Sequence, residues 1–150
     1  MSTDMSTYFE TVQVCENKHA VGTFANTEDL STQDKHLMLQ IFMKAADISN
    51  PTKPQHLCKK WSRLITEEFY RQGDKERALS MDVSAFCDRN QPEAYYKSQV
   101  GFIDVFVARL YRLVGALQPE CAGLHDNVIR NRTMWDKLNT AQEQLLSDPR

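Results

Sequence analysis

The sequence has no apolar run long enough to cross a bilayer, and its N-terminus is not a basic start followed by an apolar stretch. A transmembrane helix needs roughly 20 apolar residues, and a secretory signal needs a basic start before its apolar segment. Long blocks of like charge are also missing, and the 18 basic and 20 acidic residues leave a formal net charge of −2. We therefore expect a soluble, cytoplasmic chain that binds neither nucleic acid nor a membrane.

Cysteine and histidine are too few and too scattered to predict a metal centre. No CxxC or HxxxH pair occurs. The sequence also lacks a GxSxG motif, a P-loop and a dinucleotide-binding fingerprint, which leaves serine hydrolases and nucleotide triphosphatases without support. We expect reduced thiols, at least two of them buried, at the four cysteines, Cys15, Cys58, Cys87 and Cys121.

What the chain does have is a helical pattern. Apolar residues recur at intervals of three and four, and no segment alternates convincingly with a period of two, so we predict an all-α, multi-helix array. A chain of 150 residues can be one domain or a piece of a larger one. The predicted helices cover about 3–19, 31–46, 57–72, 93–117 and 126–146, with a short helix and a long loop between 74 and 92.

Local residues predict where some of these helices begin and end. Ser31, three residues before Asp34, is typical of an N-terminal cap. Pro51 ends the second helix, because the residue before a proline avoids helical angles. Gly73 suits the left-handed position just after the third helix. The longest helix should be well buried, because its apolar seam comprises Val100, Ile103, Phe106, Leu110, Val114 and Leu117.

Asp47 is the first candidate for chemistry. It lies where a helix gives way to a proline-bounded turn, within the sequence AADISNP. An acidic side chain there faces the negative end of the helix dipole, and its apolar neighbours predict a crowded, partly dry setting. A divalent metal is one source of the positive charge that it needs. The alternative, which composition alone favours, is an aspartate that bonds a backbone amide of its own turn.

The segment SQVGFID, at residues 98–104, is the second candidate. Gln99 and Phe102 are three residues apart and therefore share a helix face. The amide of Gln99 offers a donor and an acceptor in one plane, as a purine edge requires, and the ring of Phe102 can stack on a base. Gly101 would let a ligand approach the backbone closely. The alternative is an ordinary core phenylalanine beside a surface glutamine.

Five segments together resemble the class I 3′,5′-cyclic-nucleotide phosphodiesterases, in the C-terminal half of the catalytic domain. They occur in the order found in that family, and the resemblance covers nearly the whole chain. Each segment alone is a weak signal, but the five together are specific for the family. The segments are TDMS at 3–6, KAADISNPTKP at 44–54, the run from Trp61 to EEFYRQGDKE ending at 76, CDR at 87–89, and SQVGFID at 98–104.

The resemblance implies that residues 1–150 are part of a compact, all-helical, HD-type catalytic domain. The complete domain would hold zinc and a second ion, magnesium or manganese. Such a domain hydrolyses 3′,5′-cyclic nucleotides to 5′-monophosphates with a metal-bridging hydroxide, in signal transduction. Asp47 matches the aspartate that ligates zinc, and Gln99 matches the glutamine that reads the purine. The residues that would hold the base or line its pocket are Phe102, Ile65, Asn50, Phe69, Ile48 and Met5.

The HNxxH and HD motifs of that family have no counterpart in this sequence. They supply the other metal ligands and the histidine acid, and one carboxylate cannot hold two metal ions. We therefore expect no catalytic residue in this half and no turnover by these 150 residues alone. Pocket shape also departs from the family pattern, because Cys58 stands where relatives often have tyrosine and Phe86 where a smaller residue is common.

Two hypotheses follow. The chain is a fragment of an active phosphodiesterase, with AADISNPTKP closer to the members that prefer cAMP over cGMP. Alternatively, it is a non-catalytic helical interaction module or a degenerate relative. If it is half of a domain, one face of the long helix should be exposed and adhesive. A homodimer is compatible with the sequence.

Overall fold

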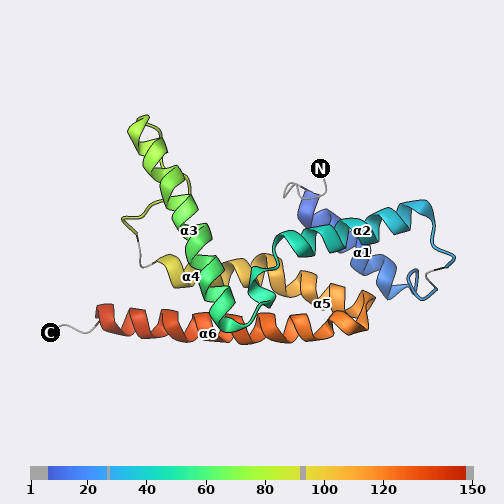
Figure 1. Cartoon of the computed structure of the whole chain (residues 1–150). Helices are drawn as coiled ribbons and strands as arrows, with labels where there is room; N and C mark the ends of the chain where they lie inside the picture. Colours follow the sequence, from blue (N-terminus) through green and yellow to red (C-terminus); the bar gives the residue numbers. More distant parts are fainter. Residues whose placement is uncertain (1–6, 27, 92–93, 148–150) are drawn as a thin grey trace.

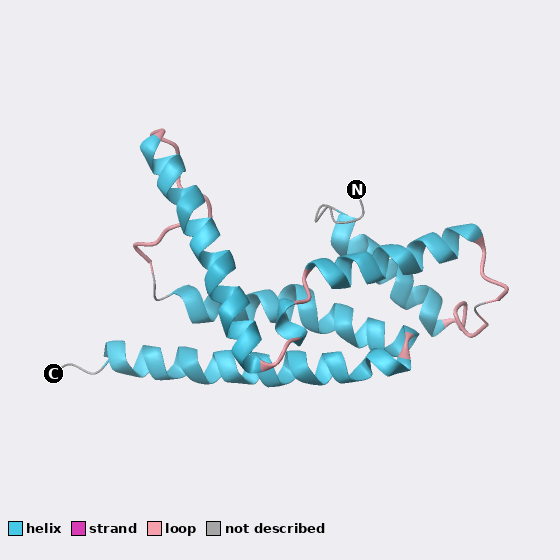
Figure 2. Cartoon of the chain, in the orientation of Figure 1, coloured by secondary structure: helices cyan, strands magenta, loops and turns pink. Residues whose placement is uncertain are grey.

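The computed structural model describes residues 7–26, 28–91 and 94–147, and every regular element in them is helical (Figure 2). Within these residues no helix combines the length and the apolar character needed to cross a membrane. The all-α prediction is therefore confirmed. The elements are α1 (Tyr8–Ala20), α2 (Thr32–Asp47), η2 (Asn50–Thr52), α3 (Gln55–Ala78), α4 (Ala94–Phe102), η3 (Ile103–Val107), α5 (Ala108–Leu117), η4 (Pro119–Cys121) and α6 (Ala122–Ser147).

The core lies where α5 packs against α6 and where α1 and α2 cover α5 (Figure 1). The predicted seam of the long helix lies largely inside it, since Ile103, Leu110 and Val114 are buried. Val12 of α1, Ile41 of α2 and Val128 of α6 are fully buried against the same cluster. Burial of these faces is the main stabilising contribution to the body of the fold.

Polar contacts fix how α1 and α2 sit on this core. The guanidinium of Arg109 donates to the carboxylate of Glu16, with Nε–Oε1 at 3.0 Å, and so joins α5 to α1. Lys18 pairs with Asp34 at 2.8 Å and joins α1 to α2. The predicted cap of α2 is confirmed, because Ser31 Oγ accepts a hydrogen bond from the amide of Asp34 at 3.1 Å.

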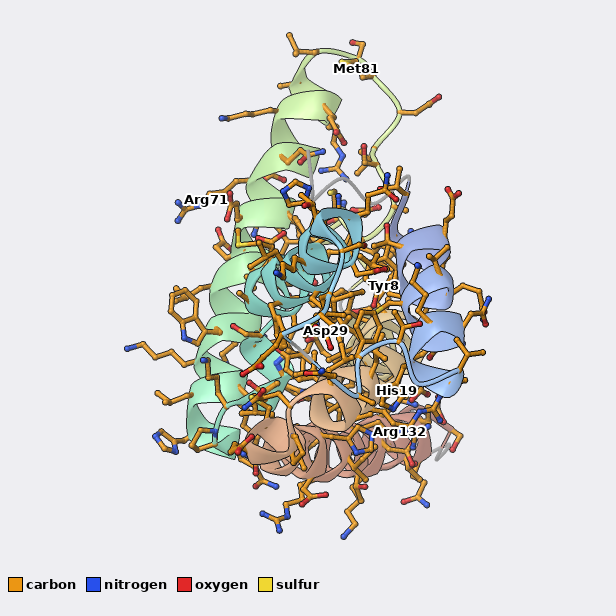
Figure 3. All side chains as sticks on the ribbon, turned by 90° about the vertical axis from the view of Figure 1, so that its right-hand side faces the viewer. Tyr8, His19, Asp29, Arg71, Met81 and Arg132 are labelled. Carbon is orange, nitrogen blue, oxygen red and sulfur yellow. The ribbon has the colours of Figure 1, made fainter. Side chains whose placement is uncertain are left out.

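Helix α3 runs longer than predicted and leaves the body (Figures 1 and 3). Arg71 and Met81 mark its outer half and the start of the following loop, away from α1 and α6 in Figure 3. The short helix predicted after residue 74 is the last turn of α3, and 79–91 contain no regular helix. Apolar residues spaced three and four apart form a stripe on α3 that is exposed, with Trp61 at 51%, Leu64 at 54% and Phe69 at 43%.

The prediction for Gly73 is wrong, because this glycine lies inside α3 and is buried. A Cβ at Gly73 would overlap the backbone carbonyl of Cys87. The position therefore needs glycine for close approach of the 79–91 loop and not for a left-handed turn. The prediction for the cysteines is confirmed, since Cys15, Cys58 and Cys87 are free and buried.

The single helix predicted over 93–117 is interrupted by a π-helical segment, η3. The amide of Ala108 donates to the carbonyl of Ile103, five residues earlier, as a π-turn requires. The hydroxyl of Tyr8 donates to the carbonyl of Phe106 in this segment. The last helix also begins earlier than predicted, at Ala122, because Gly123 is accommodated within its first turn.

Candidate functional site

Asp47 is the last residue of α2 and is exposed. The end of α2 is held in place, because the hydroxyl of Tyr111 donates to the carbonyl of Ala45 at 2.5 Å and burial raises the pKa of Tyr111 to about 12. Lys44, one turn before the end, is buried with its Nζ 5.7 Å from the ring centroid of Tyr8. The predicted dry, crowded setting is therefore wrong for the carboxylate of Asp47: the apolar contacts belong to its neighbours.

The carboxylate of Asp47 makes no hydrogen bond or ion pair with any residue that the structure describes. It does not cap its own turn, which was the alternative prediction. A side chain that projects into solvent from a fixed helix end is free to bind a ligand. It is, however, one carboxylate, and the described ranges contain no group of three or more His, Cys, Asp or Glu side chains able to hold a metal ion.

The donor set in the part of the chain that the structure describes therefore does not fit zinc together with a second divalent ion. Each such ion takes several protein ligands, and Asp47 can supply one. The remaining ligands would have to come from other sequence.

The turn after Asp47 is fastened to α6 by two asparagines. Asn131 Nδ2 donates to the carbonyls of Pro51 and Lys53, at 2.8 Å each, and is buried. Asn127 donates to the carbonyl of Thr52 at 3.1 Å. Sequence reasoning missed both, although two asparagines four apart beside the apolar positions of α6 were the available signal. The contacts fix the segment that contains Ile48 and Asn50.

Asn50 has a polar atom without a partner. Its Oδ1 is buried and accepts no hydrogen bond in the described part of the chain. A buried, unsatisfied carbonyl oxygen costs free energy, so a donor from a ligand would stabilise it. Ile48, two residues earlier, is half-buried against the core.

Gln99 and Phe102 both belong to α4, and both are half-buried. The amide of Gln99 has no hydrogen bond to a described residue and is available to a ligand. The ring of Phe102 packs on that of Phe106, with centroids 5.8 Å apart. Gly101 is exposed, and no atom of another described segment lies within 4 Å of where its Cβ would be, so this side of its backbone is open.

The π segment behind Phe102 is buttressed from α1 and α6. Tyr8 is buried, its ring lies 5.5 Å from that of Phe106, and desolvation raises its pKa to about 12, so its hydroxyl stays protonated as the donor to Phe106. Arg132 donates two hydrogen bonds to Asp104, at 3.1 and 3.0 Å. The sequence analysis did not identify the Tyr8 hydroxyl as an anchor.

Ile65 and Phe69 lie on α3, which meets α4 through a hydrogen bond between Ser62 and Tyr95 at 2.8 Å. Gln99 lies one helical turn after Tyr95, and Ile65 one turn after Ser62, so both continue the faces that meet at this junction. Ile65 and Phe69 are 38% and 43% exposed. The helices that carry Ile65, Phe69 and Gln99 are therefore in contact, but no hydrogen bond joins these three side chains in the described chain. Met5 lies outside the described residues.

Sequence comparison identifies relatives of this chain. The family model described as 3'5'-cyclic nucleotide phosphodiesterase matches residues 1–128. The chain is 44% identical over 112 residues to 3',5'-cyclic-AMP phosphodiesterase 4 of Dictyostelium discoideum, covering 75% of this chain and 10% of that protein. It is 38% identical over 143 residues to isoform F of the Drosophila melanogaster 3',5'-cyclic-AMP phosphodiesterase, covering 92% of this chain and 21% of that protein.

Solved structures of phosphodiesterases are also similar to this chain. The phosphodiesterase domain of Salpingoeca rosetta rhodopsin phosphodiesterase superposes with a TM-score of 0.87 at 25% identity, covering 97% of this chain and 44% of that one. LmjPDEB1 in complex with IBMX gives a TM-score of 0.82 at 27% identity, covering 93% and 41%. The chain thus spans about a tenth to a fifth of those curated relatives and less than half of those solved chains.

Proposed function

Because the chain belongs to the 3′5′-cyclic nucleotide phosphodiesterase family, we propose that it forms the base-binding end of a domain that hydrolyses cyclic nucleotides to 5′-monophosphates. The observation that carries this proposal is the family match over residues 1–128, which includes every predicted site residue. Two similar proteins are named as cyclic-AMP phosphodiesterases, which supports cAMP over cGMP as the substrate.

In this proposal Gln99 reads the purine edge and Phe102 stacks on the base. The half-buried, unpartnered amide of Gln99 supports the first role, since its donor and its acceptor are both available to a base edge in a partly dry site. Packing of Phe102 on Phe106 supports the second, because it holds the ring in place. Ile65 would cover the other face of the base.

Ile48, Asn50, Phe69 and Met5 are proposed to line the same pocket. The buried Oδ1 of Asn50 supports its assignment, because a donor on the ligand would satisfy it. Asp47 is proposed to contribute one metal ligand to a site that other sequence completes. The identity of the metals, zinc with magnesium or manganese, stays a prediction, as do a cytoplasmic location and a homodimer.

The 150 residues alone should not hydrolyse cyclic nucleotides, because they carry one of the several metal ligands that the reaction needs. The test is to incubate the purified chain with cAMP and, separately, cGMP in the presence of zinc and magnesium, and to measure 5′-monophosphate by chromatography. We expect no product above a protein-free control. Clear hydrolysis by the purified chain would contradict the proposal.

The site assignments are tested in a complete phosphodiesterase catalytic domain whose C-terminal half is this chain. Asp47→Ala should abolish turnover, whereas Asp126→Ala, which removes another exposed carboxylate, should leave it unchanged. Gln99→Ala should mainly raise KM, because it removes contacts to the base and not to the phosphate. Gln33→Ala is its matched control. Full activity of the Asp47→Ala enzyme would remove the metal assignment.

A non-catalytic interaction module is the second candidate, because the apolar face of α3, with Trp61, Leu64 and Phe69, is exposed and offers a surface to a partner protein. Half of a domain would expose such a face too, although the sequence predicted it on the long helix and not on α3. Reading the transcript upstream of Met1 separates the candidates. An in-frame HNxxH and HD segment supports the enzyme, and a stop codon in its place supports the module.

A further inference from the structure

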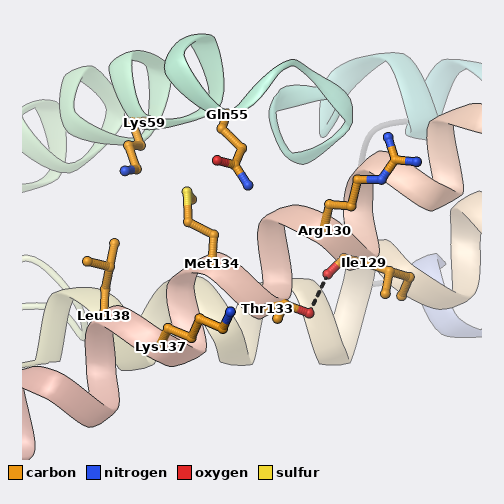
Figure 4. A pocket seen from close by; sticks show the side chains of 8 residues that line it. All are labelled: Gln55, Lys59, Ile129, Arg130, Thr133, Met134, Lys137 and Leu138. Atoms are coloured by element: carbon orange, nitrogen blue, oxygen red, sulfur yellow. Dashed lines mark hydrogen bonds between the residues drawn. The ribbon is translucent and has the colours of Figure 1, made fainter.

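A groove of about 530 Å³ runs between the start of α3 and the middle of α6, apart from the residues discussed above (Figure 4). Gln55 and Lys59 of α3 form one wall. Arg130, Met134 and Lys137 belong to the other wall, on α6. Its volume lies within the range of about 300–1,000 Å³ that is typical of ligand sites.

The groove is basic, and its cations have no acidic partner. Lys59, Arg130 and Lys137 form no ion pair with any residue in the described ranges. By contrast, the arginines elsewhere on the body and on outer α3 are mostly paired, for example Arg109 with Glu16 and Arg132 with Asp104. A second hollow of about 410 Å³ shares Lys59 and extends the positive charge along α3 with Lys60 and Arg63.

Apolar groups and a helix N-terminus complete the lining. Ile129 is 43% exposed, and Met134 and Leu138 are half-buried, so the groove offers an apolar surface between its cations. Gln55 is the first residue of α3. The first backbone amides of a helix make no hydrogen bond within it, so the amide of Gln55 lies at the positive end of the helix dipole.

We infer that this groove binds an acidic peptide segment, with its carboxylates on the cations and its apolar side chains between them. Arg130 and Lys137 are seven residues apart, about 10 Å along α6. A peptide in the polyproline II conformation has three residues per turn and rises about 3.1 Å per residue, so carboxylates three residues apart lie on one face at nearly that spacing. The inference does not depend on the proposed hydrolysis.

Other anionic partners fit less well. Lys59 lies on one wall and Arg130 and Lys137 on the other, and their side chains do not point at one place, as binding of a single phosphate would require (Figure 4). No aromatic side chain of the described residues lines the groove, whereas single-stranded nucleic acids are held largely by stacking. The cations also line a concavity, whereas a membrane surface calls for basic side chains on a face that can lie flat against headgroups.

The test uses the full 150-residue chain and a fluorescent peptide with glutamate at every third position and leucine between, read by anisotropy. The Arg130→Glu/Lys137→Glu variant should weaken binding by about tenfold or more, because two attractions become repulsions. The matched control, Lys35→Glu/Lys75→Glu, makes the same change in net charge at exposed lysines outside the groove and should bind normally. A peptide with glutamine in place of glutamate should bind at least about tenfold more weakly.

A milder variant keeps the test decisive if the double reversal unfolds, as circular dichroism would show. Lys59→Gln changes α3 alone and should weaken binding of the glutamate peptide several-fold. Equal affinity of the groove and control variants would overturn the inference, as would equal binding of the two peptides. Binding to phosphatidylserine vesicles or to single-stranded RNA, with no binding of the glutamate peptide, would also overturn it.

Discussion

The body of the molecule and helix α3 have similar helical sequences but opposite surroundings. In the body, Leu110 is fully buried, and its neighbours on α5 contact α1, α2 and α6. On α3, Leu64 is 54% exposed although it belongs to an equally regular apolar stripe. Periodicity therefore predicts which face of a helix is apolar, but not whether a partner covers it.

The two regions are also held by different forces. Buried hydrogen bonds such as those of Tyr111 and Asn131 fasten the body. Outer α3 is held to its loop by exposed ion pairs, of which Arg89 to Asp74 at 2.7 Å is one. Exposed pairs contribute about 0–1 kcal/mol each, so the outer half should open more readily than the body.

The largest expected contrast is between leucines in the two regions. Leu110→Ala should lower the free energy of unfolding by about 2–5 kcal/mol, because it leaves a cavity in the core. Leu64→Ala should change it by less than about 0.5 kcal/mol, because the side chain is already in water. Urea unfolding measures both. A large loss from Leu64→Ala would show that a partner, such as a second copy, covers α3 in solution.

A similar contrast separates two asparagines of α6. Asn131→Ala should cost about 2–3 kcal/mol, because it leaves the buried carbonyls of Pro51 and Lys53 without donors. Asn139→Ala, which removes an exposed bond to Glu143, should cost less than about 0.5 kcal/mol. Thermal unfolding by circular dichroism compares the two. Equal melting temperatures would mean that the 50–53 turn is not fastened as described.

Two glycines sharpen the comparison further. Gly73→Ala should cost about 1–3 kcal/mol or detach the loop, because the added methyl overlaps the carbonyl of Cys87. Gly101→Ala should stabilise α4 by about 0.5–1 kcal/mol, since its Cβ meets open space. Labelling of the Cys87 thiol by a maleimide should accelerate in Gly73→Ala alone. Unchanged labelling in that variant would argue against the close approach.

The smallest effect is the pH dependence of the contact between α1 and α5. The hydrogen bond from Arg109 holds the pKa of Glu16 below its ordinary 4.5. A lowered pKa in the folded state stabilises the fold above pH 4.5, and this stabilisation is lost as the pH falls further toward the folded pKa. Glu16→Gln should remove about 1 kcal/mol at neutral pH and much less in acid.

The control for that experiment is Glu10→Gln, an exposed residue of α1 without an ion pair in the described chain. Its effect on the free energy of unfolding, followed by urea titration from neutral to acidic pH, should be small throughout. If Glu16→Gln lost the same stability in acid as at neutral pH, the ion pair would not be the cause.

The places of several candidate residues on their helices could be predicted from the chain because the signals are local, whereas their roles stay predictions. The proline-bounded end of α2 places Asp47, and the three-residue spacing places Gln99 and Phe102 on one face of α4. The role of Gly73 could not be predicted, since its neighbour Cys87 is distant in sequence. The anchoring roles of Tyr8 and Asn131 were hidden for the same reason.

The sequence by itself determined the helical class, the apolar face of each helix, the cap at Ser31 and the family to which the motifs belong. These follow from contacts within a few residues, which backbone geometry and side-chain type decide. Only the tertiary structure decided that the seam of α5 is buried while the stripe of α3 is exposed, that η3 interrupts a long helix, and that cations of α3 and α6 share a groove. Those outcomes depend on which helices pack together. Hydrophobic burial stabilises such packing but is non-directional, so no short stretch of residues specifies the partner.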